Sequence, residues 1–100
     1  MTITLEQTLR ILRANADALR AKGVLHAAVF GSVARGQPGK DSDIDVLVEI
    51  DPGKHVGLFG YSSIKLALDR LMDRKVDMVD AKVLKAIVRE EVMREKVDAF

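Results

Sequence analysis

The segment from Asp43 to Ile50 constrains the fold more than any other part of the chain. Every even-numbered position in it is apolar, whereas three of its four odd-numbered positions carry Asp43, Asp45 and Glu49. Successive side chains of a strand point to opposite faces of a sheet. The alternation therefore predicts a strand over Ile44–Ile50 with one apolar face and one acidic face.

The first half of the chain predicts a helix, a strand and a loop. A capping-box pattern at Thr4 and Gln7, followed by apolar residues at helical spacing, predicts a helix from Leu5 to Lys22. The apolar run from Val24 to Phe30 predicts a buried strand. Turn-forming residues then fill positions 31–42, which predicts a loop with one short helical turn.

The second half predicts a crossover helix, a short strand and a last helix. The crossover helix ends near Arg74, and the short strand covers Val76–Val79. Asp80 is expected to cap the last helix, and the tail from Lys96 to Phe100 either frays or adds an edge strand. The buried stripe of the last helix is expected to consist of Leu84, Ile87, Val88 and Val92.

These elements predict an α/β (α+β) fold, a small mixed β-sheet covered by helices in the order α-β-(short α)-β-α-β-α. A strand-helix-strand connection within one sheet is nearly always right-handed and parallel, so the second and third strands are expected to be parallel. A chain of 100 residues has the size of one domain, and we expect residues 1–100 to form it.

Charge and composition exclude several classes of function. The 16 Lys and Arg residues nearly balance the 15 Asp and Glu residues, which disfavours direct binding to nucleic acid or to an acidic membrane. No run is apolar enough for a membrane span, and no signal peptide is evident. The absence of cysteine leaves oxygen and imidazole as metal ligands. We therefore expect a cytoplasmic protein.

Asp43, Asp45 and Asp77 are the candidate metal ligands. Residues two apart on a strand have Cα atoms about 6.6 Å apart on one face, and Asp77 is expected on the neighbouring strand. Two unit charges about 6 Å apart repel by about 3 kcal/mol at an effective dielectric constant near 20. Carboxylates gathered in this way favour Mg²⁺ or Mn²⁺. Taken singly, Asp43 could be a strand-entry residue and Asp45 could lie on a solvated face.

The loop after the first strand is a candidate phosphate-binding site. Gly31 and Ser32 stand where backbone N–H groups can receive a phosphate, and Arg35 is a better candidate cation than Lys40. The glycine spacing is that of a P-loop, but Gln and Pro occupy positions 37 and 38, where such a loop needs Lys and Ser or Thr. Walker-type ATPase chemistry is therefore excluded, and no dinucleotide-binding fingerprint follows the strand.

These motifs resemble a known superfamily. The Gly-Ser pair at 31–32, ten intervening residues and the Asp-Ile-Asp of 43–45 resemble the G-S-x10-D-x-D signature of nucleotidyltransferases related to DNA polymerase β. The strings at 31–36 and 42–48 resemble those of its shortest members, the minimal nucleotidyltransferase (MNT) antitoxins. Residues 75–79 resemble the strand that carries the third carboxylate of the family. The resemblance spans essentially the whole chain.

The resemblance implies a role for each motif residue. Asp43 and Asp45 would hold two Mg²⁺ ions, with Mn²⁺ as an alternative, and these ions would clamp the triphosphate of ATP. Asp77 would complete the metal site and help to deprotonate the attacking hydroxyl. The implied nucleotide-binding residues are Gly31, Ser32, Arg35 and Ser42.

The resemblance also implies a partner. Nucleotidyltransferases that modify small molecules carry a further domain for the acceptor, and this sequence leaves no residues for one. An MNT antitoxin transfers AMP from ATP to a tyrosine of a HEPN-family ribonuclease toxin, with which it is expected to form a hetero-oligomer. Two alternatives remain open: neutralisation of the toxin by binding alone, and transfer to RNA or a small metabolite. The near-neutral charge and an aromatic content of 4% disfavour RNA.

Overall fold

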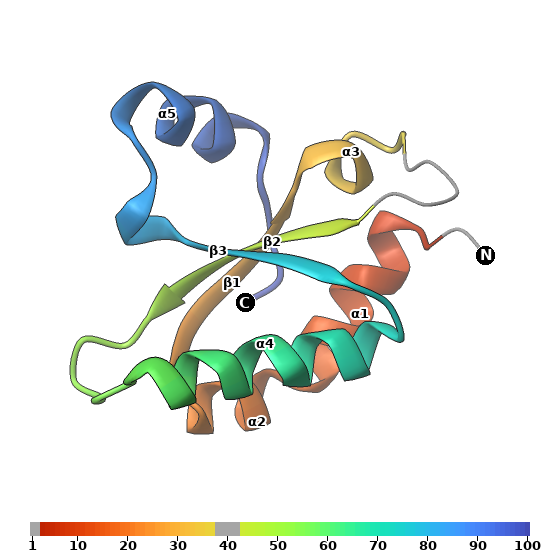
Figure 1. Cartoon of the computed structure of the whole chain (residues 1–100). Coiled ribbons are helices and arrows are strands. Elements are labelled where there is room, and N and C mark those ends of the chain that lie inside the picture. The colour runs from red at the N-terminus through yellow and green to blue at the C-terminus, as the bar shows by residue number, and fades with distance from the viewer. Residues whose placement is uncertain (1–2, 38–42) are drawn as a thin grey trace.

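The computed structural model of the chain describes residues 3–37 and 43–100, and its centre is a four-stranded sheet in the order β3-β2-β1-β4 (Figure 1). The strands are β1 (Val24–Phe30), β2 (Ile44–Ile50), β3 (Val76–Asp80) and β4 (Val97–Asp98). Strand β1 runs antiparallel to both of its neighbours, whereas β2 and β3 are parallel. The predicted mixed sheet is therefore confirmed, and the tail forms the edge strand β4.

The helices follow the predicted order with one break. They are α1 (Leu5–Ala14), α2 (Ala16–Ala21), α3 (Gly31–Ala34), α4 (Leu58–Met72), the 3-10 helix η1 (Ala81–Val83) and α5 (Ala86–Glu95). The helix predicted over residues 5–22 is interrupted at Asn15, whose backbone leaves the helical region and whose side-chain amide donates to the Ile11 carbonyl at 2.8 Å. The capping box of Thr4 and Gln7 forms as predicted.

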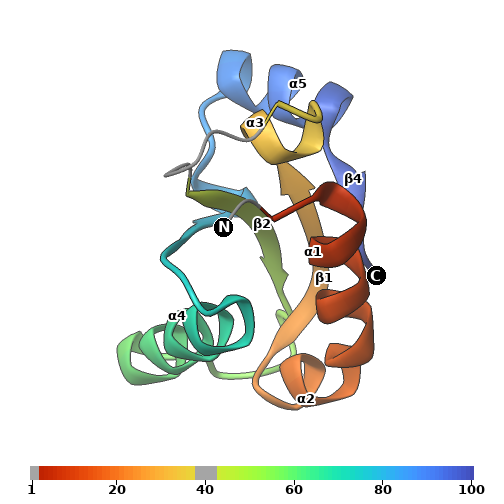
Figure 2. The ribbon, with the colours of Figure 1, turned by 90° about the vertical axis from the view of Figure 1, so that its right-hand side faces the viewer.

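Helices cover both faces of the sheet, but unequally. Figures 1 and 2 show α1, α2 and α4 against one face and α5 against the other. The large core lies on the first face, and its residues include Leu12, Leu19, Val29, Val46, Ile64 and Leu68. A smaller cluster on the α5 face consists of Ala28, Leu47, Ala81 and Val92. The even positions of β2 therefore face the large core, and its odd positions, which carry the acidic residues, face α5.

The start and the buried stripe of the last helix differ from the prediction. The Asp80 carboxylate accepts a hydrogen bond from the Lys82 amide at 2.9 Å and so caps η1, while α5 begins only at Ala86. Of the four residues of the predicted stripe, Val92 alone is buried, and Ile87 is 82% exposed. Helical periodicity identifies an apolar stripe, but it does not reveal how much of the sheet is available to cover it.

None of the helices within residues 3–37 and 43–100 combines the length and the apolar character that crossing a membrane requires.

Candidate active site

Three segments of the chain meet at one end of the sheet, where β1 ends and β2 and β3 begin. Because β1 and β2 are antiparallel, the last residue of β1, Phe30, lies opposite Asp45 near the start of β2. Because β2 and β3 are parallel, Asp77 near the start of β3 lies beside Asp45 in register. The topology thus places Asp45, Asp77 and the segment that begins at Gly31 together, as the spacing of the motifs predicts.

At this end of the sheet, the backbone of Gly31 lies very close to the side chain of Asp45. Gly31 has a φ of +73°, in the left-handed region that favours glycine. A Cβ atom at this position would lie 2.1 Å from the Asp45 Oδ2 atom and 3.0 Å from its Cγ atom. Glycine is therefore needed here both for the backbone conformation and for the space that the carboxylate occupies.

The charge at Asp45 is poorly compensated. Burial raises the pKa of the Asp45 carboxyl above its ordinary value, and the negative charges of Asp77 and Asp43 raise it further. The positive charge of Arg35 acts in the opposite direction, but it does not reverse the shift. A carboxylate in this setting is stabilised by a proton or by a cation, and hard oxygen donors of this kind fit Mg²⁺ or Mn²⁺.

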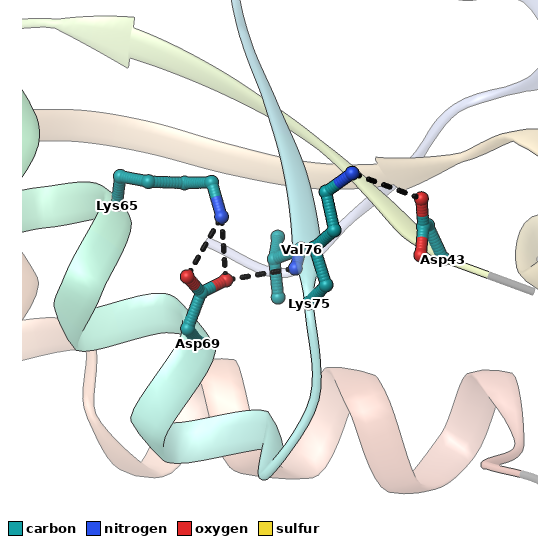
Figure 3. Close-up of polar contacts among 5 residues, drawn as sticks. All are labelled: Asp43, Lys65, Asp69, Lys75 and Val76. Carbon is teal, nitrogen blue, oxygen red and sulfur yellow. Dashed lines mark hydrogen bonds and ion pairs between the residues drawn. The ribbon is translucent and has the colours of Figure 1, made fainter.

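Asp43 has a partner of its own. Lys75 extends from the segment just before β3, and its Nζ atom lies 3.9 Å from the Asp43 Oδ2 atom (Figure 3). Nowhere in the described ranges 3–37 and 43–100 do three or more His, Cys, Asp or Glu side chains form a group arranged to hold a metal ion. Asp43, Asp45 and Asp77 are thus neighbours at this end of the sheet, and Asp43 also lies within ion-pair distance of Lys75.

The hydrogen-bond donors of the site, the Gly31 N–H and the Arg35 guanidinium, both contact Glu95. Glu95, at the end of α5, accepts a hydrogen bond from the Gly31 N–H at 3.0 Å. The Arg35 Nη1 atom lies 3.1 Å and 3.3 Å from the two carboxylate oxygens of Glu95. Glu95 is not among the residues predicted from the sequence, because no short-range spacing connects it with residues some 60 positions earlier. Ser32 is half-buried on α3, and the predicted residues Lys40 and Ser42 lie outside the described residues.

Asp69, on α4, holds the start of β3 in place through a hydrogen bond to its backbone. Its carboxylate accepts from Lys65 Nζ at 2.7 Å and from the Val76 backbone N–H at 2.8 Å (Figure 3). The hydrogen bond from Lys65, followed by that from Val76, lowers the pKa of the Asp69 carboxyl. Asp69 therefore holds in place the strand that carries Asp77.

Replacing Asp69 with Asn is expected to lower the free energy of unfolding by about 1 kcal/mol at pH 7, because the charged hydrogen bonds are lost. The pKa of Asp69 is lower in the folded than in the unfolded protein, so its contribution is present above pH ~4 and is lost as the pH falls through the folded-state value. Urea unfolding at several pH values checks this expectation. A difference between the two proteins that stays constant down to pH 3 would contradict it.

Comparison with known proteins places the chain among a defined set of relatives. Residues 9–99 match the nucleotidyltransferase domain family. The chain is 35% identical over 96 residues to the protein adenylyltransferase MntA of Thermococcus cleftensis, and the alignment covers 95% of each protein.

Solved structures show the same fold. One of them, provisionally assigned as a minimal nucleotidyltransferase, is 39% identical and has a TM-score of 0.71, with coverage of 89% of this chain and 93% of that one. A chain from a complex of tri-AMPylated Shewanella oneidensis HEPN toxin with MNT antitoxin has a TM-score of 0.63 at 17% identity. This second match covers 92% of the present chain and 71% of the other, and at that identity it indicates the fold alone.

Proposed function

The chain belongs to the nucleotidyltransferase domain family, and from this premise we propose that it is a protein adenylyltransferase that acts as the antitoxin of a HEPN ribonuclease toxin. The family predicted from the sequence is confirmed. The close approach of Gly31 to Asp45, with Asp77 in register beside it, carries the proposal. It brings the proposed phosphate-binding segment within contact distance of the carboxylates that a nucleotidyl transfer needs.

Each carboxylate has a proposed role. Asp43 and Asp45 would hold Mg²⁺, which when bound supplies charge stabilisation to the triphosphate and to the departing pyrophosphate. The poorly compensated charge at Asp45 supports this assignment, since a bound cation would relieve it. Asp77 lies beside Asp45 and would accept the proton of the attacking hydroxyl.

The reaction is a substitution at phosphorus. The oxygen of a tyrosine hydroxyl on the toxin forms a bond to the α-phosphorus of ATP, and the bond from that phosphorus to the bridging oxygen breaks. AMP remains on the tyrosine, pyrophosphate leaves, and the hydroxyl proton passes to a carboxylate. The proposed contacts to the terminal phosphates come from Gly31, Ser32, Arg35 and Ser42.

The proposed partner follows from the relatives. The similar protein of Thermococcus cleftensis is a protein adenylyltransferase, and a solved chain of the same fold comes from a complex in which a HEPN toxin carries AMP. We propose that this chain likewise forms a hetero-oligomer with its toxin, in the cytoplasm where a ribonuclease meets RNA. Residues 1–100 would act as one catalytic domain, with the toxin supplying the acceptor.

The test is transfer of labelled AMP to the proposed HEPN toxin partner. With Mg²⁺ and ATP labelled at the α-phosphate, the toxin is expected to gain label on tyrosine and to lose its ribonuclease activity. A toxin variant with that tyrosine replaced by Phe should stay unlabelled. An unlabelled wild-type toxin would refute the proposal.

The double variant Asp43→Asn/Asp45→Asn separates catalysis from simple occlusion. If neutralisation is catalytic, the variant folds and binds the toxin but leaves its ribonuclease active. Full neutralisation by this variant without ATP would instead show that binding alone is sufficient.

A further inference from the structure

We propose that Glu95 is an internal competitor for the nucleotide: its carboxylate occupies the Gly31 N–H and the Arg35 guanidinium until the triphosphate displaces it. The inference rests on the proposed function, in which these two groups bind phosphate. It adds a residue from α5 that sets the affinity of the site for ATP.

The contacts of Glu95 are those of a bound anion. One carboxylate oxygen accepts from Gly31 N at 3.0 Å and from Arg35 Nη1 at 3.1 Å, and the other lies 3.3 Å from the same Nη1 atom. Charge-assisted hydrogen bonds of this kind are also the contacts that phosphate oxygens make. Both views of the ribbon place the end of α5 beside α3 (Figures 1 and 2).

The two anions cannot use the same donor together. A backbone N–H has one hydrogen, so the Gly31 amide cannot give a full hydrogen bond to Glu95 and to a phosphate at the same time. Glu95 also adds negative charge close to Asp45, and a triphosphate held alongside it would be repelled. The side chains of Glu95 and Arg35 are 34% and 50% exposed, so a ligand from solvent can reach the pair.

The position of Glu95 on its own helix supports this interpretation. It is the last residue of α5, and an acidic side chain at a helix C-terminus is disfavoured by the negative end of the helix dipole. Helix stability therefore does not account for a glutamate here. The contacts with Gly31 and Arg35 do account for it.

Replacing Glu95 with Gln tests the inference. The variant keeps the size of the side chain but loses its charge, so ATP and inorganic tripolyphosphate are both expected to bind about tenfold more tightly by isothermal titration calorimetry. In AMP transfer, the KM for ATP should fall by a similar factor. Glu91→Gln is the matched control, because Glu91 is exposed on the same helix and its loss changes the net charge equally.

A second variant provides an independent test in case Glu95→Gln does not fold. Glu95→Asp keeps the charge and shortens its reach to Gly31, and it too should bind tripolyphosphate more tightly than the wild-type protein. Circular dichroism identifies any variant that fails to fold.

The outcomes separate this inference from the proposed function. Equal or weaker binding by both folded Glu95 variants, with a wild-type protein that binds ATP and transfers AMP, would overturn the inference and leave the function intact. A wild-type protein that neither binds ATP nor transfers AMP would overturn both.

Discussion

Replacing Asp45 with Asn is expected to reduce AMP transfer by about 10³-fold while making the folded protein more stable. The loss of activity follows because a carboxylate that holds the metal contributes several kcal/mol to the stabilisation of the transition state. The gain in stability follows because burial and the charges of Asp77 and Asp43 disfavour the ionised form of Asp45.

The pH dependence of this gain has a definite sign. The pKa of Asp45 is higher in the folded than in the unfolded protein, so its ionisation destabilises the fold at neutral pH. That penalty decreases as the pH falls through the folded-state pKa, and it is gone below the unfolded value of about 4. The stability advantage of the Asn variant should therefore be largest near pH 7 and should vanish under acidic conditions.

Thermal unfolding with and without Mg²⁺ measures the effect without any enzyme assay. Mg²⁺ should raise the melting temperature of the wild-type protein and leave that of Asp45→Asn nearly unchanged, because a ligand stabilises only the state that binds it. Glu49→Gln is the matched control, since Glu49 is exposed on the same strand and its loss changes the charge equally. A variant that melts below the wild-type protein at pH 7 would contradict the charge argument.

The sequence pattern was sufficient to predict those parts of the structure that local rules and sheet topology determine. Strands β1 and β2 have the predicted bounds, because alternation and a following glycine define a strand locally. The pairing of Asp45 with Asp77 follows from the parallel arrangement of strands joined by a crossover helix. The end of the sheet at which the candidate site residues lie could therefore be predicted from the sequence.

Long-range partners could not be predicted in this way. The contact of Arg35 with Glu95 depends on how α5 packs across the sheet, and no spacing in the sequence encodes it. The pairing of Asp43 with Lys75 depends in the same way on where β3 begins. The predicted stripe of α5 was wrong for a related reason. The buried apolar cluster on that face consists of Ala28, Leu47, Ala81 and Val92, so α5 buries Val92 there and leaves Ile87 exposed.

Replacing Gly31 with Ala is expected to lower the free energy of unfolding by about 3 kcal/mol, which corresponds to a fall of about 15 °C in the melting temperature. About 1 kcal/mol of this comes from the positive φ of +73°, and the rest from the clash of the new Cβ atom with the Asp45 carboxylate. AMP transfer should be lost as well, because Asp45 has to move to make room.

Gly36 provides the control for the backbone. Its φ of +72° is nearly the same, but a Cβ atom there would meet no atom of the described residues within 4 Å. Gly36→Ala should therefore show only the backbone cost of about 1 kcal/mol. Equal losses of unfolding free energy in the two variants would mean that the clash with Asp45 contributes nothing to the destabilisation of Gly31→Ala.

The double variant Gly31→Ala/Asp45→Ala isolates the contact itself. With the carboxylate removed, the new Cβ atom would still lie 3.3 Å from the Asp45 Cβ atom, a tight but tolerable distance. The cost of Gly31→Ala should therefore be smaller by about 1–2 kcal/mol in the Asp45→Ala background than in the wild-type protein. Strictly additive losses would show that Gly31 and Asp45 do not touch. The contact that joins the proposed phosphate-binding segment to the carboxylates would then be absent, and the proposed active site would lose its main support.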